Sequence, residues 1–154
     1  MAEITLYDLM MRLVGTKEIA GTKDNSFIKW CLELDGPPGM EIHDEIPNCS
    51  AVMNRLAWFL RLPRSKSWMA RSWLNIGTPI TLAEARPGFD IVILKRGGAD
   101  QPGPEVLNAP GHVTLYAGMG PDSTHFQGLG ANQGDQINVA PFLLDRILGV
   151  RRLA

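Results

Sequence analysis

The chain has 154 residues, and its 15 lysines and arginines are nearly balanced by 16 aspartates and glutamates. This length suits one compact domain, which can bury enough surface to fold without disulfides or metals. The sequence has no basic run, which argues against a nucleic-acid partner held through many phosphate contacts. Two cysteines are too few for a disulfide scaffold.

The first residues, MAEITLYDLMMRLVG, mix acidic with apolar residues and lack the basic start of a secretory signal. No stretch approaches the ~20 apolar residues of a membrane span. We therefore expect no stable membrane insertion. We expect the chain to be made in the cytosol, where thiols stay reduced. A protein of this kind that acts outside the cytosol needs another agent to deliver it.

The first half of the chain has a helical pattern. Residues 4–14 are weakly amphipathic, and residues 27–34 form a second apolar stretch ended by glycine and two prolines. Over residues 49–60 the apolar side chains recur at the i, i+3, i+4 and i+7 spacing of one buried helical stripe, which Pro63 ends. A further helix is expected over residues 66–74.

After Gly77 the sequence consists of short β-type runs separated by turn residues. The runs FDIVIL, HVTLYAG, THFQGLG and DQINVAPF predict an antiparallel meander, and VRRLA is expected to add an edge strand. Helices followed by strands indicate the α+β class. The connection over residues 96–111 is longer than the usual two to six residues, which indicates a functional or flexible loop.

Cys49 is the first candidate for chemistry, because it stands in the first turn of a predicted buried helix. A helix N-terminus favours the thiolate over the thiol, and its free N–H groups can stabilise the oxyanion formed at an attacked carbonyl. The periodicity alone also fits the alternative that Cys49 is only the first core residue of the stripe.

His112 opens an apolar strand and is the candidate base for Cys49. Such a pair needs a third polar group to hold the imidazole in one tautomer. Asn132 is the preferred candidate, with its neighbour Gln133 or His125 as alternatives. The Asn132 segment, LGANQGD, also fits a plain turn.

Other residues are weaker candidates. Cys31 lies within a helical stretch next to Trp30, which indicates structural burial. His43 has neighbouring acidic residues, but no second histidine or cysteine stands at a metal-ligand spacing. We expect neither a metal nor a cofactor.

The order of these residues resembles that of the papain-like peptidoglycan hydrolases of the NlpC and CHAP type. Within that group, a small phage-associated branch resembles this chain in the blocks EIAGTKDNSFI, DEIPNCSAVMNRL, ARSWLNIGTPI, PGFDIVILKRG, GHVTLYAG, LGANQGDQINV and DRILGVRR. The resemblance implies a papain-like α+β fold, with the nucleophile at a helix start packed on a C-terminal antiparallel sheet.

The chain departs from that branch around the nucleophile. The residue before the cysteine is usually tryptophan there, or aspartate in the wider superfamily, whereas this chain has Asn48. The usual aromatic residue after the CSA sequence is replaced by Val52 and Met53. The shape of the substrate pocket is therefore expected to differ, and the Asn48 amide is expected to donate to the oxyanion.

The resemblance implies a mechanism and a substrate. Cys49 attacks an amide carbonyl with His112 as base, Asn132 or Gln133 orients His112, and water hydrolyses the thioester. The implied substrate and partner is the stem peptide of peptidoglycan, cut by an endopeptidase or an amidase.

The whole chain, residues 1–154, is expected to form one catalytic domain and to act as a monomer. A phage endolysin that reaches the periplasm or cell wall through a holin fits this organisation, as do a virion-borne hydrolase and a secreted antibacterial toxin or effector. The alternative from another class is a non-catalytic binding module on the same fold.

Overall fold

The computed structural model describes residues 2–154. Three α-helices come first: α1 (Leu6–Met11), α2 (Ser26–Glu33) and α3 (Cys49–Phe59). Six strands follow: β1 (Thr78–Ile80), β2 (Asp90–Lys95), β3 (Gly111–Met119), β4 (His125–Gly130), β5 (Asn138–Leu143) and β6 (Ile147–Arg152). Three short 3-10 helices lie between them: η1 (Ala70–Asn75), η2 (Leu82–Glu84) and η3 (Leu144–Arg146). The predicted α+β class is confirmed.

The strands form one sheet in the order β1-β6-β2-β3-β4-β5, and every neighbouring pair is antiparallel. The predicted meander is present as β2 to β5. The prediction that the last strand forms an edge is wrong, because β6 lies between β1 and β2, with Val150 opposite both Ile80 and Val92. The edge strand β1 has only three residues, one of them proline, which left too short a pattern to predict.

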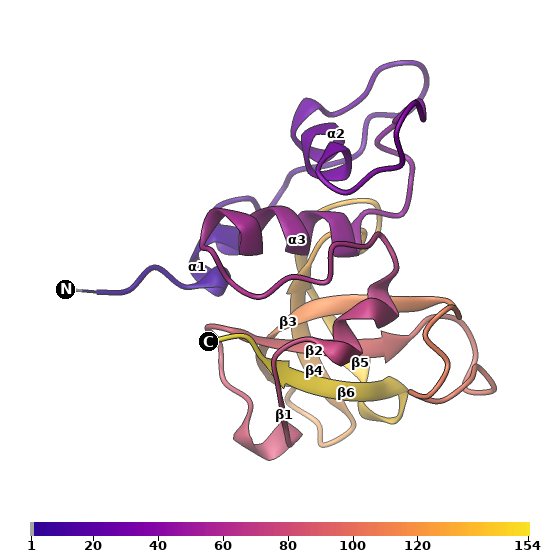
Figure 1. Ribbon diagram of the computed structural model, residues 1–154. Coiled ribbons are helices and arrows are strands. Elements are labelled where there is room, and N and C mark those ends of the chain that lie inside the picture. The colour runs from indigo at the N-terminus through magenta and orange to yellow at the C-terminus, as the bar shows by residue number, and fades with distance from the viewer. Residues whose placement is uncertain (1) are drawn as a thin grey trace.

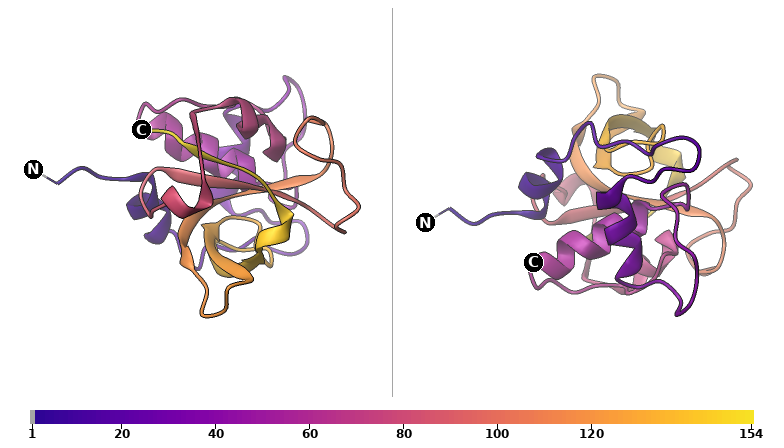
Figure 2. Two further views of the ribbon diagram at one scale, coloured as in Figure 1. Left: turned by 90° about the horizontal axis from the view of Figure 1, so that it is seen from below. Right: turned by 90° about the horizontal axis from the view of Figure 1, so that it is seen from above.

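The helices cover one face of the sheet, and α3 lies between α2 and the strands (Figure 1). Viewed from below, the sheet lies in front of the helices, and from above the helices lie in front of the sheet (Figure 2). The larger core fills the space between them and includes Met53, Trp73 and Val113. A smaller core that includes Val92 and Phe126 is closed by side chains from β1, η2, β5 and η3.

Helices α2 and α3 are joined through Arg55. Its guanidinium lies 3.8 Å from the centre of the Trp30 ring and also donates a hydrogen bond to the Trp30 carbonyl. A cation–π contact with a buried arginine such as Arg55 stabilises the packing of one helix on another. This contact holds α2 against the outer face of α3.

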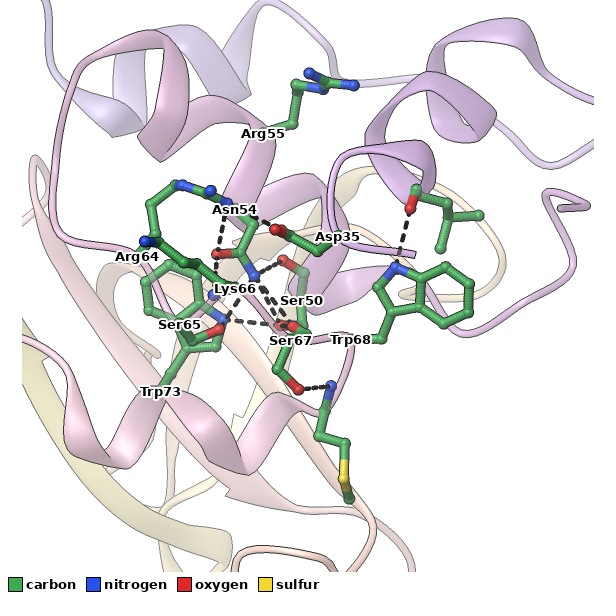
Figure 3. A network of polar contacts seen from close by, with 12 residues as sticks. Asp35, Ser50, Asn54, Arg55, Arg64, Ser65, Lys66, Ser67, Trp68 and Trp73 are labelled. Atoms are coloured by element: carbon green, nitrogen blue, oxygen red, sulfur yellow. Dashed lines mark hydrogen bonds and ion pairs between the residues drawn. The ribbon is translucent and has the colours of Figure 1, made fainter. Parts of the chain in front are cut away.

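The prediction of a helix over residues 66–74 is wrong for the first half of that range. Lys66 has a left-handed φ of 57°, so no helix runs through it, and the 3-10 helix η1 begins only at Ala70. The side chain of Asn54 explains the difference, since its Oδ1 accepts from the Lys66 N–H at 3.0 Å and its Nδ2 donates to the Ser67 carbonyl at 3.1 Å. The backbone polar groups at 66 and 67 are therefore satisfied by α3 and not by a helix of their own (Figure 3).

One buried arginine is hydrogen-bonded to the long loop between β2 and β3 and holds it in place. The fully buried Arg71 side chain donates from Nε to the Pro110 carbonyl at 3.0 Å, and from Nη1 to the carbonyls of Gly103 at 2.8 Å and Val106 at 3.0 Å. These charge-assisted bonds anchor the middle and the end of the loop to η1.

Among residues 2–154, no helix has both the length and the apolar composition that crossing a membrane requires.

Candidate active site

Cys49 is the first residue of α3 and is almost wholly buried, with 4% of its surface exposed. The N-cap residue, Asn48, makes no side-chain hydrogen bond to the first turn. The N–H groups of that turn therefore keep their donor capacity beside the sulfur, and the partial positive charge of the helix N-terminus acts on it.

The residue after the cysteine fixes the start of α3. The Ser50 hydroxyl donates to the Ser67 carbonyl at 2.6 Å and accepts from the Trp73 indole N–H at 2.9 Å. Asn54, one turn later, donates to the Ser50 carbonyl at 3.1 Å (Figure 3). This buried network holds the N-terminal turn, and with it Cys49, in one position.

The imidazole of His112, near the start of β3, is the group that lowers the pKa of the Cys49 thiol most. Burial raises the pKa of Cys49, but the hydrogen bond and charge of His112 and the Val113 N–H outweigh it and lower the pKa below its usual value. Burial lowers the pKa of His112, but the bond and charge of Cys49 raise it above its usual value. The lowered pKa of Cys49 and the raised pKa of His112 both favour a thiolate–imidazolium pair.

Gln133 holds the other nitrogen of the imidazole. Its Oε1 lies 3.0 Å from His112 Nε2 and accepts from the Thr114 hydroxyl at 2.8 Å. Its Nε2 donates to the carbonyls of Gly128 at 3.0 Å and Asn138 at 2.9 Å, which fixes the orientation of the amide. Because Oε1 can only accept, the proton is on His112 Nε2, and Nδ1 is left to face the sulfur.

Two glycines of β4 leave space for this amide and for the side chains beside it. A Cβ on Gly130 would lie 2.8 Å from Gln133 Oε1 and 2.9 Å from Thr114 Oγ1. A Cβ on Gly128 would lie 2.7 Å from the Thr114 side chain and 2.8 Å from the Phe142 ring. The alternating glycines of HFQGLG therefore serve the hydrogen bonds around His112.

Asn132, the preferred third residue, lines the same cleft as His112, but its side chain makes no hydrogen bond to the imidazole. Asn132 has a left-handed φ of 59°, and its buried Nδ2 has no hydrogen-bond partner among the described residues. His125, the other alternative, is paired with Asp122, with 3.1 Å between His125 Nδ1 and Asp122 Oδ1. Of the three candidates, only Gln133 is hydrogen-bonded to the imidazole.

Asn48 also differs from expectation. Its Nδ2 donates to Glu18 Oε1 at 3.0 Å and to the Asp44 carbonyl at 3.2 Å. Both amide hydrogens are thus engaged in holding the loop before α3 to the N-terminal segment, and neither is left for an oxyanion. The backbone N–H groups of α3 are the donors that remain.

Phe142 of β5 is a part of the site that the sequence did not indicate. Its ring stacks on the imidazole of His112, with centroids 5.3 Å apart and planes at 29°. Phe142 and His112 line a cleft of about 350 Å³, together with Leu94, Lys95, Arg96, Gly97, Asn132, Gln133, Gly134, Ala140 and Arg146. The only signal for Phe142 was its place in the strand that follows Gln133.

No group of three histidine, cysteine or acidic side chains that could hold a metal ion is found within residues 2–154. The chemistry offered by the described residues is that of an activated thiol beside a hydrogen-bonded imidazole.

The two cysteines are expected to react at different rates. Burial raises the pKa of Cys31 to about 12 and outweighs the opposing charge of Arg55, whereas the pKa of Cys49 is lowered. Iodoacetamide near neutral pH is therefore expected to label Cys49 first, and mass spectrometry of the digested protein measures both sites. Equal labelling of the two cysteines in the folded protein would contradict the thiolate assignment.

No protein-family model matches the sequence, and no curated protein matches it either. Two solved structures from Trichomonas vaginalis share its fold. The NlpC2 structure matches with a TM-score of 0.58 and 18% sequence identity over 99% of this chain and 48% of its own. The NlpC1 structure matches with a TM-score of 0.54 and 17% identity over 96% of this chain and 42% of its own. This chain spans less than half the length of either protein.

Proposed function

We propose that this protein is a cysteine peptidase of the papain-like NlpC type that cleaves amide bonds in the peptide part of peptidoglycan. The observation that carries the proposal is the series of Cys49, His112 and Gln133, in which Gln133 is hydrogen-bonded to the imidazole and the imidazole lowers the pKa of a thiol at a helix N-terminus. The shared fold with NlpC1 and NlpC2 and the sequence blocks described above support the substrate class.

In the first half of the reaction, the Cys49 thiolate attacks the amide carbonyl carbon. The negative charge that forms on the carbonyl oxygen is stabilised by backbone N–H groups in the first turn of α3. His112 gives its Nδ1 proton to the leaving nitrogen, the carbon–nitrogen bond breaks, and a thioester remains on Cys49. His112 then removes a proton from water, which hydrolyses the thioester and releases the acid.

We assign Gln133 as the positioning residue for His112. Its Oε1 accepts the Nε2 proton throughout the cycle, which keeps Nδ1 available to the sulfur and to the leaving nitrogen. Stacking by Phe142 covers the ring and keeps it in the plane that this bond requires.

The remaining assignments rest on the sequence. We propose one catalytic domain over residues 1–154, which acts as a monomer, binds the stem peptide without a cofactor, and has no nucleic-acid partner. A phage endolysin delivered to the periplasm or cell wall fits this proposal. Cleavage between stem residues makes it an endopeptidase, and cleavage at the sugar–peptide junction makes it an amidase.

Digestion of purified peptidoglycan tests the function. The protein is expected to release soluble fragments, and mass spectrometry of the new amine and carboxyl ends identifies the bond that is cut. The matched control is the same protein alkylated at Cys49 with iodoacetamide, which is expected to release nothing. Intact peptidoglycan after prolonged incubation with unmodified protein, across a range of stem-peptide types, would refute the proposed function.

A further inference from the structure

The cleft beside His112 has a marked charge. Lys95, Arg96 and Arg146 line it, and none of its lining residues is acidic. Since the chain as a whole is nearly neutral, three cations around one cleft of about 350 Å³ are a local feature and not a consequence of composition.

The sheet and the 3-10 helix η3 bring these cations together. Leu94 lies opposite His112 on β3 and opposite Ile147 on β6, so the residues that follow Leu94 and precede Ile147 are neighbours. The Arg146 guanidinium donates to the Gly97 carbonyl, which ties η3 to the turn after β2.

The charges of these residues are only partly compensated. Arg146 has one carboxylate neighbour, Asp145, with Nε and Oδ1 3.4 Å apart and Asp145 largely exposed. Among the described residues, the Lys95 ammonium donates only to the Ala99 carbonyl, at 3.3 Å. Arg96 is exposed and has no side-chain partner among residues 2–154. The Arg96 guanidinium can therefore bind an anion in the cleft without breaking an existing ion pair.

Arg96 also acts on the reacting groups. Burial and the mutual hydrogen bond of Cys49 and His112 have the larger effects on their pKa values, and the positive charge of Arg96 contributes to lowering both. Arg96 and His112 also line the same cleft, so a group held near Arg96 is close to the site of bond cleavage.

The position of the cleft indicates which half of the substrate it receives. His112 gives its proton to the leaving nitrogen, so the amine side of the scissile bond lies on the imidazole side of Cys49. The cleft is lined by His112 and not by Cys49. The apolar residues that line the cleft include Phe142, Ala140 and Leu94. They can contact the carbon chain of a substrate residue while the charged end of that residue binds the cations.

We propose that this cleft is a binding site for a carboxylate on the residue at the amine side of the scissile bond, with Arg96 as its main ligand. The inference rests on the proposed function for the direction of the substrate. Lys95 and Arg146 add positive charge, and Arg96 determines specificity without taking part in bond cleavage.

A pair of alkylating reagents tests the charge of the cleft without any peptidoglycan. The same Cys49 thiolate attacks the CH2 carbon of iodoacetate and of iodoacetamide and displaces iodide from each. The ratio of the two rates therefore cancels changes in thiolate content and reports the local field. Arg96→Gln is expected to lower the iodoacetate to iodoacetamide ratio by about threefold to tenfold. The matched control is Arg86→Gln, an exposed arginine before the opposite end of β2, which is expected to leave the ratio unchanged. An unchanged ratio in Arg96→Gln overturns the proposal.

Peptide pairs test the ligand itself. Stem peptides that differ only in a free or amidated carboxyl group on the amine-side residue, at the side chain in one pair and at the main chain in another, identify which carboxylate is bound. The protein is expected to prefer the free carboxylate by about 10- to 100-fold in kcat/KM, and Arg96→Gln to remove most of that preference.

The two failures are distinguishable. Equal cleavage of free and amidated peptides overturns the carboxylate site and leaves the peptidase intact. No cleavage of any peptide, with the reagent ratio still dependent on Arg96, refutes the proposed function and leaves an anion-attracting cleft beside a reactive thiol.

Discussion

A Cys49→Ala variant is expected to lose hydrolysis of peptidoglycan by at least about 10³-fold, because no other described side chain near His112 can form the thioester. The variant is expected to keep its fold, since alanine fits a helix start and removes only one sulfur from a site that is 4% exposed. Release of soluble fragments measures activity, and thermal unfolding measures the fold. Undiminished hydrolysis by Cys49→Ala would overturn the mechanism.

Cys31→Ala is the matched control for the loss of a buried thiol. Cys31 is fully buried in α2, so its replacement removes core contacts and is expected to cost about 1 kcal/mol of folding free energy, a fall of about 2–4 °C in Tm. Its hydrolytic rate is expected to stay that of the unmodified protein. The two variants thus separate loss of chemistry from loss of stability.

Gln133→Ala is expected to lower kcat/KM by about 10²- to 10³-fold, because the imidazole loses the acceptor that fixes its Nε2 proton and its orientation. The change also leaves the Gly128 and Asn138 carbonyls without the Gln133 amide, which is expected to cost about 1–3 kcal/mol of stability. Activity alone therefore does not separate a positioning role from a structural one.

The pH profile makes that separation. Activity needs the thiolate and the imidazolium together, so it rises as pH passes the lowered pKa of Cys49 and falls as pH passes the raised pKa of His112. The bond from Gln133 is one of the causes that raise the pKa of His112, after the larger opposing effect of burial and the contribution of Cys49. Gln133→Ala is therefore expected to move the alkaline limb to lower pH, which a merely destabilising change does not do.

Asn132→Gly is the matched control for Gln133→Ala. Glycine accepts the left-handed φ of 59° at this position, and the Asn132 amide makes no hydrogen bond to the imidazole. The kcat/KM of this variant is expected to stay within about threefold of that of the unmodified protein, and the alkaline limb of its pH profile is expected not to move. A larger loss in Asn132→Gly than in Gln133→Ala would reverse the assignment of the positioning residue.

The long loop after β2 was expected to be functional or flexible, and the structure gives it a definite anchor. A single buried arginine, Arg71, binds three of its carbonyls, yet nothing in the sequence ARSWLN distinguishes this arginine from an exposed one. Its partners lie more than 30 residues away in the chain, so only the folded structure brings them together.

Local patterns were sufficient where the physical cause is local. The stripe that begins at Cys49 predicts α3, because burial of one helical face leaves a period that can be read directly. The short β-type runs after Gly77, each bounded by turn residues, predict β2 to β5, because a strand and the turn that ends it are both set by neighbouring residues. The same reasoning identified Cys49 and His112 as candidates, because each stands at the start of such an element.

The sequence by itself determined the α+β class, the helix that carries the thiol and the strand that carries the imidazole. Only the tertiary structure decided between Asn132 and Gln133, because a turn with left-handed residues sends neighbouring side chains in different directions. The glycine at 130 leaves space for the side chain that points inward, that of Gln133. It also decided the place of β6 and the gathering of Lys95, Arg96 and Arg146 around one cleft. These features depend on strand pairing between distant segments, which no local period records.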